Sequence, residues 1–190
     1  MILGSDGAGV VAAIRDDVTA FQVGQEVYAM MERNRSGSFA EYAIAKVDAI
    51  APKPELLSYI EAASIPAVAL TAWQALFDKG HLSARQTVLI HGAAGGVGMF
   101  AVQLAKWKGA RLIATASAAS ITTVRELGAD EVIDYRTTPF EQVVQGVDVV
   151  LDILGGETRS RSWQVLSPGG ILVSTVPPPP QAPKVCVVKC

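Results

Sequence analysis

The chain has 190 residues, of which 50% are hydrophobic, 18% are charged and 6% are aromatic, and its formal net charge is −2. This composition can bury a sizeable core and excludes an intrinsically disordered chain. The small net charge, without a basic run, argues against nucleic acid or an acidic membrane surface as a partner.

The same sequence argues against membrane insertion, secretion and a disulfide framework. No apolar run approaches the ~20 residues that cross a bilayer. The first six residues lack the charged and apolar parts of a secretory signal. The two cysteines, Cys186 and Cys190, both lie at the C-terminal end, which excludes a disulfide framework. We therefore expect a soluble, cytoplasmic protein.

The first sixty residues alternate short β-like runs with turn residues. The runs cover residues 9–14, 26–30 and 38–44, and Gly24 and Gly37 lie between them. Pro52 and Pro54 lead into a connector. This pattern predicts a small antiparallel, barrel-like unit.

From about residue 61 the apolar residues change period, and strands alternate with helices. Residues 70–77 have the spacing of a helix. Apolar strands are predicted over residues 87–91, 111–116, 131–134, 147–151 and 171–176, with helices over 97–108 and 121–127. This alternation predicts an α/β fold, a doubly wound parallel sheet with right-handed crossovers. Residues 177–190 open with four prolines and show no periodicity, which is typical of a tail.

A glycine-rich loop, HGAAGGVG at residues 91–98, lies between the first of these strands and the helix after it. Dinucleotide-binding folds place their pyrophosphate loop at this junction. Gly95 would let the backbone approach the phosphates, and Gly98 would let the helix pack closely on the strand. A P-loop is excluded because no Gly-Lys-Ser/Thr follows. The alternative is a tight turn without a ligand. The predicted cofactor contacts in this loop are Ala94, Gly95, Gly96, Val97 and Gly98.

The end of the next strand distinguishes NAD(H) from NADP(H). An Asp or Glu there would bind the ribose 2′-hydroxyl and favour NAD, whereas residues 115–120 read TASAAS. Ser117 leaves room for a 2′-phosphate, so NADP(H) is favoured over NAD(H). The nearest basic residue, Arg125, lies outside this loop. The alternative is that Ser117 only caps the helix that follows.

Further motifs stand in order around the glycine loop. GSDGAGVV at residues 4–11, VGQEVY at 23–28, GSFAEY at 37–42 and LTAW at 70–73 precede it, and LGADEVIDY at 127–135 and PGG at 168–170 follow it. Over about residues 2–177 the chain closely resembles the zinc-independent quinone oxidoreductase branch of the medium-chain dehydrogenase/reductase superfamily, which is related to zinc-type alcohol dehydrogenases.

The resemblance implies three parts, truncated at both ends relative to the family. These are a partial GroES-like β-barrel substrate domain (residues 1–60), a Rossmann domain without its last strand (61–176) and a Pro-rich tail (177–190).

The resemblance also implies a reaction. It is the NADPH-dependent transfer of hydride to a quinone or an α,β-unsaturated carbonyl, with a small-molecule substrate and no metal. Zinc-dependent relatives hold their metal with His-Glu at the positions of Ser5 and Asp6 and with Cys at the position of Ala67. These residues cannot form a three-ligand site here, so we expect no zinc. A homodimer is compatible with the resemblance.

Single residues outside the glycine loop are assigned by the same resemblance. Thr71 matches a threonine that positions the nicotinamide, Tyr135 lines the adenosine pocket, and Gly155 and Val176 lie where the nicotinamide passes. Each has a structural alternative: a helix threonine bonded to a preceding carbonyl, a surface aromatic, or plain turn and strand residues. No catalytic residue is identified. Tyr42 is a weak candidate for a proton donor and is more typical of a strand residue.

Two histidines and one arginine are notable for their positions in the sequence. His81 and His91 receive no catalytic role, because neither has a carboxylate partner that the sequence can place. Arg85 stands where the family has a glycine, in the turn before the first Rossmann strand. A positive φ there would strain the backbone.

Three other functions can be compared with the same residues. A short-chain dehydrogenase needs Tyr and Lys four residues apart on a helix, and Tyr42 and Lys46 have that spacing. They precede the glycine loop in a strand-like stretch, so this interpretation is rejected. A truncated, catalytically silent nucleotide-binding fragment or subunit is the main alternative, because strands that line the family's substrate pocket are missing. A zinc alcohol dehydrogenase ranks third.

Overall fold

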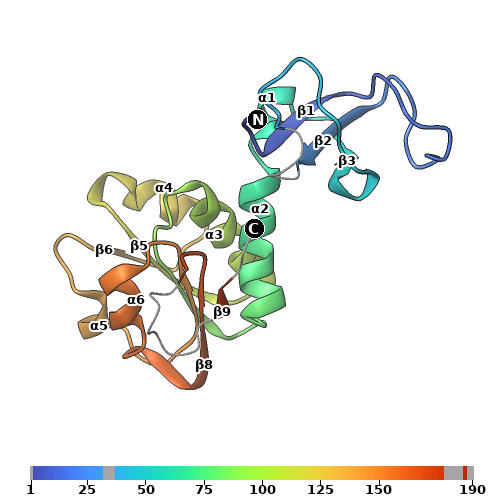
Figure 1. Ribbon diagram of the computed structural model, residues 1–190. Coiled ribbons are helices and arrows are strands. Elements are labelled where there is room, and N and C mark those ends of the chain that lie inside the picture. Colours follow the sequence, from blue (N-terminus) through green and yellow to red (C-terminus); the bar gives the residue numbers. More distant parts are fainter. Residues whose placement is uncertain (1, 32–36, 178–185, 188–190) are drawn as a thin grey trace. The chain divides into compact units, whose positions relative to one another are not determined.

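The described residues of the computed structural model, 2–31, 37–177 and 186–187, fall into two units (Figure 1). Unit 1 is Met1–Val68 and unit 2 is Ala69–Cys190. This division lies eight residues after the boundary expected from the sequence.

Unit 1 is built on a three-stranded antiparallel sheet in the order β1-β2-β3. Its elements are β1 (Asp6–Val10), β2 (Glu26–Met30), the 3-10 turn η1 (Val47–Ala49), β3 (Ile50–Pro52) and α1 (Tyr59–Ala63). Helix α1 begins at a capping box, in which the Ser58 hydroxyl accepts from the Glu61 N–H and the Glu61 carboxylate accepts from the Ser58 N–H. The antiparallel unit expected from the turn-rich sequence is therefore present.

Two of its predicted strands were placed incorrectly. The first strand ends at Val10 instead of spanning 9–14. Residues 38–44 form no strand: the N–H groups of Ser38 and Phe39 bond to the carbonyls of Gly4 and Leu3, and the Ala40 N–H then turns back to the Ser38 carbonyl. The apolar side chains beyond this turn are exposed, Ile44 by 86%, so no buried face sustains an alternating strand.

Unit 2 contains a parallel sheet in the order β6-β5-β4-β7-β8-β9. The strands are β4 (Thr87–Ile90), β5 (Arg111–Ala116), β6 (Glu131–Asp134), β7 (Val147–Asp152), β8 (Leu166–Ser174) and β9 (Cys186–Val187). The doubly wound α/β sheet expected from the strand–helix alternation is thus confirmed. One detail differs. The segment expected as a tail contributes the two residues of β9 beside β8, while residues 178–185 and 188–190 of that segment lie outside the described residues.

Helices cover both faces of this sheet (Figure 1). They are α2 (Pro66–Trp73), which contains the boundary between the units and continues into the π-helical η2 (Gln74–Lys79), then α3 (Gly96–Lys108), η3 (Ala118–Ser120), α4 (Ile121–Glu126), α5 (Phe140–Val143) and α6 (Gly156–Ser162). Successive strand residues point to opposite faces. Val88 and Ile90 therefore join one buried cluster with residues of α3, while Leu89 joins a second cluster with Phe140 of α5.

Candidate functional site

The strand order reverses between β4 and β7, whose carboxyl ends therefore border a crevice. In open α/β sheets this is the place where ligands bind. The glycine loop follows β4 and is bonded to strands on both sides. The His91 N–H donates to the Leu151 carbonyl at the end of β7, and the Ala93 N–H donates to the Thr115 carbonyl of β5. The predicted nucleotide loop thus lies at the switch point of the sheet.

Within the loop, Gly98 and Gly95 have different surroundings. A Cβ on Gly98 would lie 2.3 Å from the Gly92 carbonyl oxygen and 2.7 Å from the Ala93 Cα. A Cβ on Gly95 would meet only the Gly92 oxygen, at 3.3 Å. Gly98 is therefore required for the close packing of α3 on the loop, whereas the exposed Gly95 leaves room for another molecule to approach the backbone.

The start of α3 presents N–H groups to this space. The Met99 N–H bonds to the Gly95 carbonyl at 2.8 Å, which is the first i to i−4 bond of the helix. The N–H groups of Gly96, Val97 and Gly98 precede it in the first turn, where an α-helix has no internal acceptor for them. Ala94, Gly95 and Gly96 are exposed. A 13-residue helix that begins in this way can bind an anion.

His91 is a buried structural residue of the same loop. Its Nε2 lies 2.9 Å from the Ser162 Oγ and its Nδ1 lies 3.1 Å from the Thr115 Oγ1. The Ser162 hydroxyl donates to the Thr158 carbonyl, so it accepts from the Nε2–H, and the Nδ1 accepts from Thr115. Burial lowers the pKa of His91 to about 4, so the ring is neutral at pH 7. Both ring nitrogens are therefore engaged by hydroxyl groups of the protein itself.

Gly155 and Val176, assigned separately from the sequence, are in contact. Gly155 has φ +71°, and a Cβ there would lie 2.9 Å from the Val176 Cγ1. The turn after β7 also reaches the glycine loop, because a Cβ on Gly92 would lie 3.4 Å from the Leu154 Cδ2. The ends of β4, β7 and β8 therefore border one site.

Three polar residues that hold this arrangement, Asp152, Ser174 and Arg159, were not identified from the sequence. Asp152 is fully buried and accepts from the N–H groups of Leu154 and Gly155 and from the Ser174 hydroxyl. Arg159 is buried on α6 and donates to the carbonyls that follow β8. A polar residue at the end of an apolar strand was the available signal, but its partners depend on the pairing of β7 with β8.

The edge formed by β5 and β6 brings Ser117 and Tyr135 together. The Tyr135 N–H donates to the Ala116 carbonyl at 3.2 Å. Ser117 lies at the N-cap position of η3 but makes no side-chain capping bond, so its hydroxyl does not serve as the helix cap. The Arg136 guanidinium lies 5.8 Å from the centroid of the Tyr135 ring. Arg136 was missed because it follows the strand end of β6 rather than that of β5.

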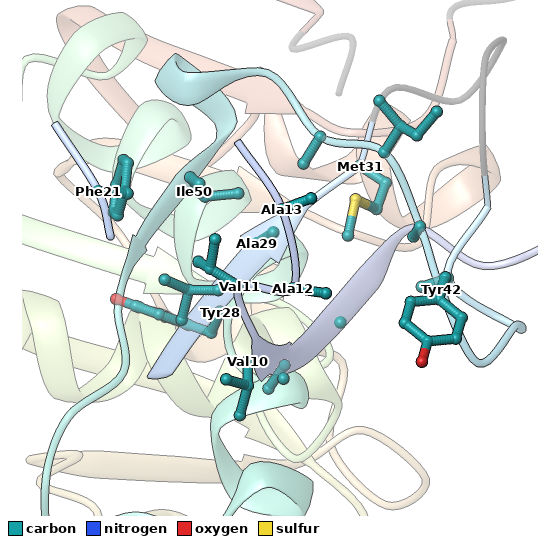
Figure 2. Close-up of a pocket in the computed structure, with 18 of the residues that line it drawn as sticks. Val10, Val11, Ala12, Ala13, Phe21, Tyr28, Ala29, Met31, Tyr42 and Ile50 are labelled. Atoms are coloured by element: carbon teal, nitrogen blue, oxygen red, sulfur yellow. The ribbon is translucent and has the colours of Figure 1, made fainter. Parts of the chain in front are cut away.

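The other predicted residues have different environments. Thr71 is buried on α2 in unit 2. Tyr42 belongs to unit 1, where its side chain is 78% exposed and lines a mainly apolar cavity of about 650 Å³. Figure 2 shows the cavity with Val10, Tyr28 and Ile50 also on its lining.

The positions that correspond to zinc ligands in the resemblance bond to one another. The Asp6 carboxylate accepts from the Ala67 N–H at 2.6 Å and from the Ser5 hydroxyl at 2.8 Å. Within residues 2–31, 37–177 and 186–187, no three His, Cys, Asp or Glu side chains are grouped to hold a metal ion. Among the described helices, none is both long and apolar enough to cross a membrane.

Two family models match the chain. The model described as alcohol dehydrogenase GroES-like domain matches residues 1–55, and the model described as zinc-binding dehydrogenase matches residues 96–183.

Individual relatives agree with these models. An NAD(P)H oxidoreductase named RTN4IP1, mitochondrial, from Danio rerio is 39% identical over 94% of this chain and 48% of its own length. The structure of a quinone oxidoreductase from Coxiella burnetii superposes with a TM-score of 0.84 at 38% identity, over 90% of this chain and 55% of that one. The CurK enoyl reductase gives a TM-score of 0.83 at 35% identity, over 92% and 53%. The chain spans about half the length of these relatives.

Proposed function

Because the chain belongs to the medium-chain dehydrogenase/reductase superfamily of oxidoreductases, we propose that it transfers hydride from NADPH to a quinone or an α,β-unsaturated carbonyl. The observation that carries this proposal is the glycine loop at the sheet's switch point. There the unbonded N–H groups of Gly96 and Val97 adjoin exposed backbone at Ala94 and Gly95. Relatives named quinone oxidoreductase and enoyl reductase support the substrate class.

The residues of unit 2 divide the binding of the cofactor among them. When bound, the nicotinamide supplies the hydride. The N–H groups at the start of α3 would bind the pyrophosphate, Thr71 would position the nicotinamide, and Gly155 and Val176 would line its side of the site. The hydride, which carries both electrons, would pass to the electron-poor atom of the substrate, and a proton from water or from the exposed Tyr42 would complete the reduction.

The substrate must be activated without a metal. A zinc-dependent relative would polarise its carbonyl with the metal, but Ser5 and Ala67 offer no zinc-binding side chain at the corresponding positions, and the Asp6 carboxylate is bonded to both. Quinones and enones accept hydride because their conjugated carbonyls already stabilise the resulting anion. Stoichiometric zinc in the purified protein would contradict this part of the proposal.

A preference for NADPH rests on the edge formed by β5 and β6. The end of β5 carries Ser117 instead of an acid, which removes the group that would repel a 2′-phosphate. Arg136, beside the Tyr135 ring, supplies a cation at the neighbouring strand end. A guanidinium suits a phosphate because it donates several hydrogen bonds from one plane.

The test of cofactor choice measures NADPH and NADH affinities by titration. We expect Ser117→Asp to weaken NADPH binding about 100-fold or more, while NADH binding changes little. Charge repulsion of the 2′-phosphate and the loss of its contact with the serine together cost about 3 kcal/mol. Arg136→Ala should weaken NADPH selectively by about 10-fold. Arg125→Ala is the matched control, because it also removes one arginine but at a position on α4, outside the ends of β5 and β6. Equal effects on both cofactors would contradict the NADPH assignment.

Turnover is measured separately by the loss of absorbance of the reduced nicotinamide over a panel of quinones and enones. The panel includes simple ketones, which lack the conjugated double bond and should not react. NADPH binding without turnover on any quinone or enone would favour the alternative, a catalytically silent nucleotide-binding fragment or subunit. Turnover of any quinone or enone would contradict this alternative.

Assembly and location complete the proposal. A homodimer is proposed from the family resemblance, and sedimentation equilibrium tests it by the mass of the particle. The Danio rerio relative is named as a mitochondrial protein, so the cytoplasmic location expected for this chain stays a prediction. Fluorescent tagging in cells distinguishes the two compartments.

A further inference from the structure

We propose that Asp152 is a positioning residue that holds residues 152–155 and 174–177, the β7–β8 turn pair, in the arrangement that receives the nicotinamide half of the dinucleotide. This inference rests on the proposed function. It assigns a role to a carboxylate that neither the glycine motif nor the family resemblance singled out, and it separates that role from pyrophosphate and adenosine binding elsewhere in the site.

The Asp152 carboxylate bonds groups in both turns. Asp152 is fully buried, and a buried charge is costly unless several donors satisfy it. Its Oδ1 accepts from the N–H groups of Leu154, at 3.0 Å, and Gly155, at 2.8 Å. Its Oδ2 accepts from the Ser174 hydroxyl at 2.8 Å. One side chain therefore fixes the turn after β7 and joins it to the end of β8.

The end of β8 is fixed by the same group of residues. The Ser174 Oγ also accepts from the Val176 N–H at 3.2 Å. The buried Arg159 donates to the Val176 carbonyl at 3.0 Å and lies 3.4 Å from the Pro177 carbonyl. Gly155 packs against Val176 so closely that a Cβ would lie 2.9 Å from its Cγ1. The two turns of the pair therefore cannot move independently.

The turn pair presents an apolar surface beside the glycine loop. Leu154 is 55% exposed, yet its Cδ2 would lie only 3.4 Å from a Cβ on Gly92 of the glycine loop. Val176, which packs against the neighbouring Gly155, is half-buried. An apolar surface next to a loop of free N–H groups matches a dinucleotide, whose phosphates need donors while its nicotinamide ring needs a shaped, largely apolar neighbour. Asp152 itself is fully buried and its oxygens are bonded to the two turns, so it acts through the turns.

The experiment compares two ligands on the full chain. NADPH carries the nicotinamide, whereas adenosine 2′,5′-bisphosphate carries the adenosine and 2′-phosphate without it. We expect Asp152→Ala to weaken NADPH at least 10-fold and to change the bisphosphate affinity by less than twofold. Asp152→Asn should recover most of the NADPH affinity. Its amide oxygen can still accept from the two turn N–H groups, and its NH₂ can donate to the Ser174 Oγ while the serine hydroxyl turns to the Val176 carbonyl.

A matched control lies on the same strand. Asp148, also on β7, accepts the Thr87 N–H with its Oδ2 at 2.8 Å, but it lies toward the amino end of the strand. Asp148→Ala should lower stability without changing the ratio of the two affinities. If Asp152→Ala does not fold, Ser174→Ala removes the link between the turns and the serine's own bonds to Val176, while Asp152 keeps its bonds to the Leu154 and Gly155 N–H groups. It should weaken NADPH about threefold, again with the bisphosphate unchanged.

The outcomes are distinguishable. Equal weakening of both ligands by Asp152→Ala, or by Ser174→Ala, would show general structural damage and overturn the inference. Unchanged NADPH affinity in both variants would overturn it as well, with the proposed function intact. Wild-type protein that binds neither ligand would overturn the proposed function itself, and this inference with it.

Discussion

The substitution Gly98→Ala tests the packing of α3 on the glycine loop. The added Cβ would lie 2.3 Å from the Gly92 carbonyl oxygen, while ordinary contact begins near 3.4 Å, so the helix and the loop would have to separate by about 1 Å. The nearest atoms all belong to backbone, which cannot rotate away. Overpacking of this kind costs about 3 kcal/mol, and the better helix propensity of Ala returns about 1 kcal/mol. We expect a net loss of about 2 kcal/mol.

Gly95→Ala is the matched variant. Its Cβ meets only one atom, at 3.3 Å, and its φ of −82° is accessible to any residue. The loss of a glycine at the N-cap position costs about 0.5–1 kcal/mol. We expect this variant to remain nearly as stable as the wild type but to bind NADPH at least 10-fold more weakly, because the methyl group occupies space that the phosphates need.

Urea unfolding followed by tryptophan fluorescence measures both variants. All three tryptophans, Trp73, Trp107 and Trp163, belong to unit 2, so the signal reports the unit that contains the loop. A Gly98→Ala protein within about 0.5 kcal/mol of the wild type would refute the packing argument, since that is the scatter of neutral surface substitutions. A Gly95→Ala protein as unstable as Gly98→Ala would refute the division of roles.

Three further predictions concern stability. Arg85 has φ +70°, so Arg85→Gly should remove a strain of about 1–2 kcal/mol at a chain-entropy cost of about 0.5–1; a small gain in urea midpoint is expected, and a loss would contradict the strain. Burial lowers the pKa of His91 from 6.5 to about 4, so only the unfolded chain takes up this proton between those values. Stability should therefore fall by about 3 kcal/mol as the pH drops from above 6.5 to 4. In His91→Gln the free energy of unfolding, measured in urea at a series of pH values, should change less between pH 6.5 and 4. An unchanged pH dependence would mean that other groups cause the loss of stability. Ser58→Ala removes the capping box of α1 and should destabilise unit 1 by about 1 kcal/mol; amide NMR signals of β1 and β2 in urea measure this, with unit 2 signals as the internal control.

The parallel sheet could be predicted because its strands are buried on both faces. The run at 131–134 matches β6 in both bounds, and the run at 111–116 matches β5. Unit 1 was harder. Residues 38–44 combine aromatic and small residues as a strand would, but their apolar side chains lie exposed, and β3 was missed because it is three residues long and ends in a proline.

The candidate site divides in the same way between local and distant features. The glycine loop could be predicted because its function depends on neighbouring residues and on its place between strand and helix. The roles of Asp152 and Arg159 could not, because Asp152 also bonds Ser174 at the end of β8 and Arg159 bonds the carbonyls that follow β8, and β8 is separated from β7 by α6. Arg136 becomes a candidate for binding the 2′-phosphate only when β5 and β6 pair, because this pairing brings Tyr135 beside Ser117. Sequence patterns thus placed the glycine loop at the candidate site, while the residues that support it required the fold.

The anchoring of two amides by one buried carboxylate has a consequence for hydrogen exchange. Residues 153–155 connect a strand to a helix and would be expected to exchange their amide hydrogens as fast as other connecting segments. The N–H groups of Leu154 and Gly155 are instead bonded to Asp152, so their release requires the ends of β7 and β8 to open together. In deuterated buffer these two amides should exchange at the slow rate of the central strands, although Leu154 exposes more than half of its side chain to water.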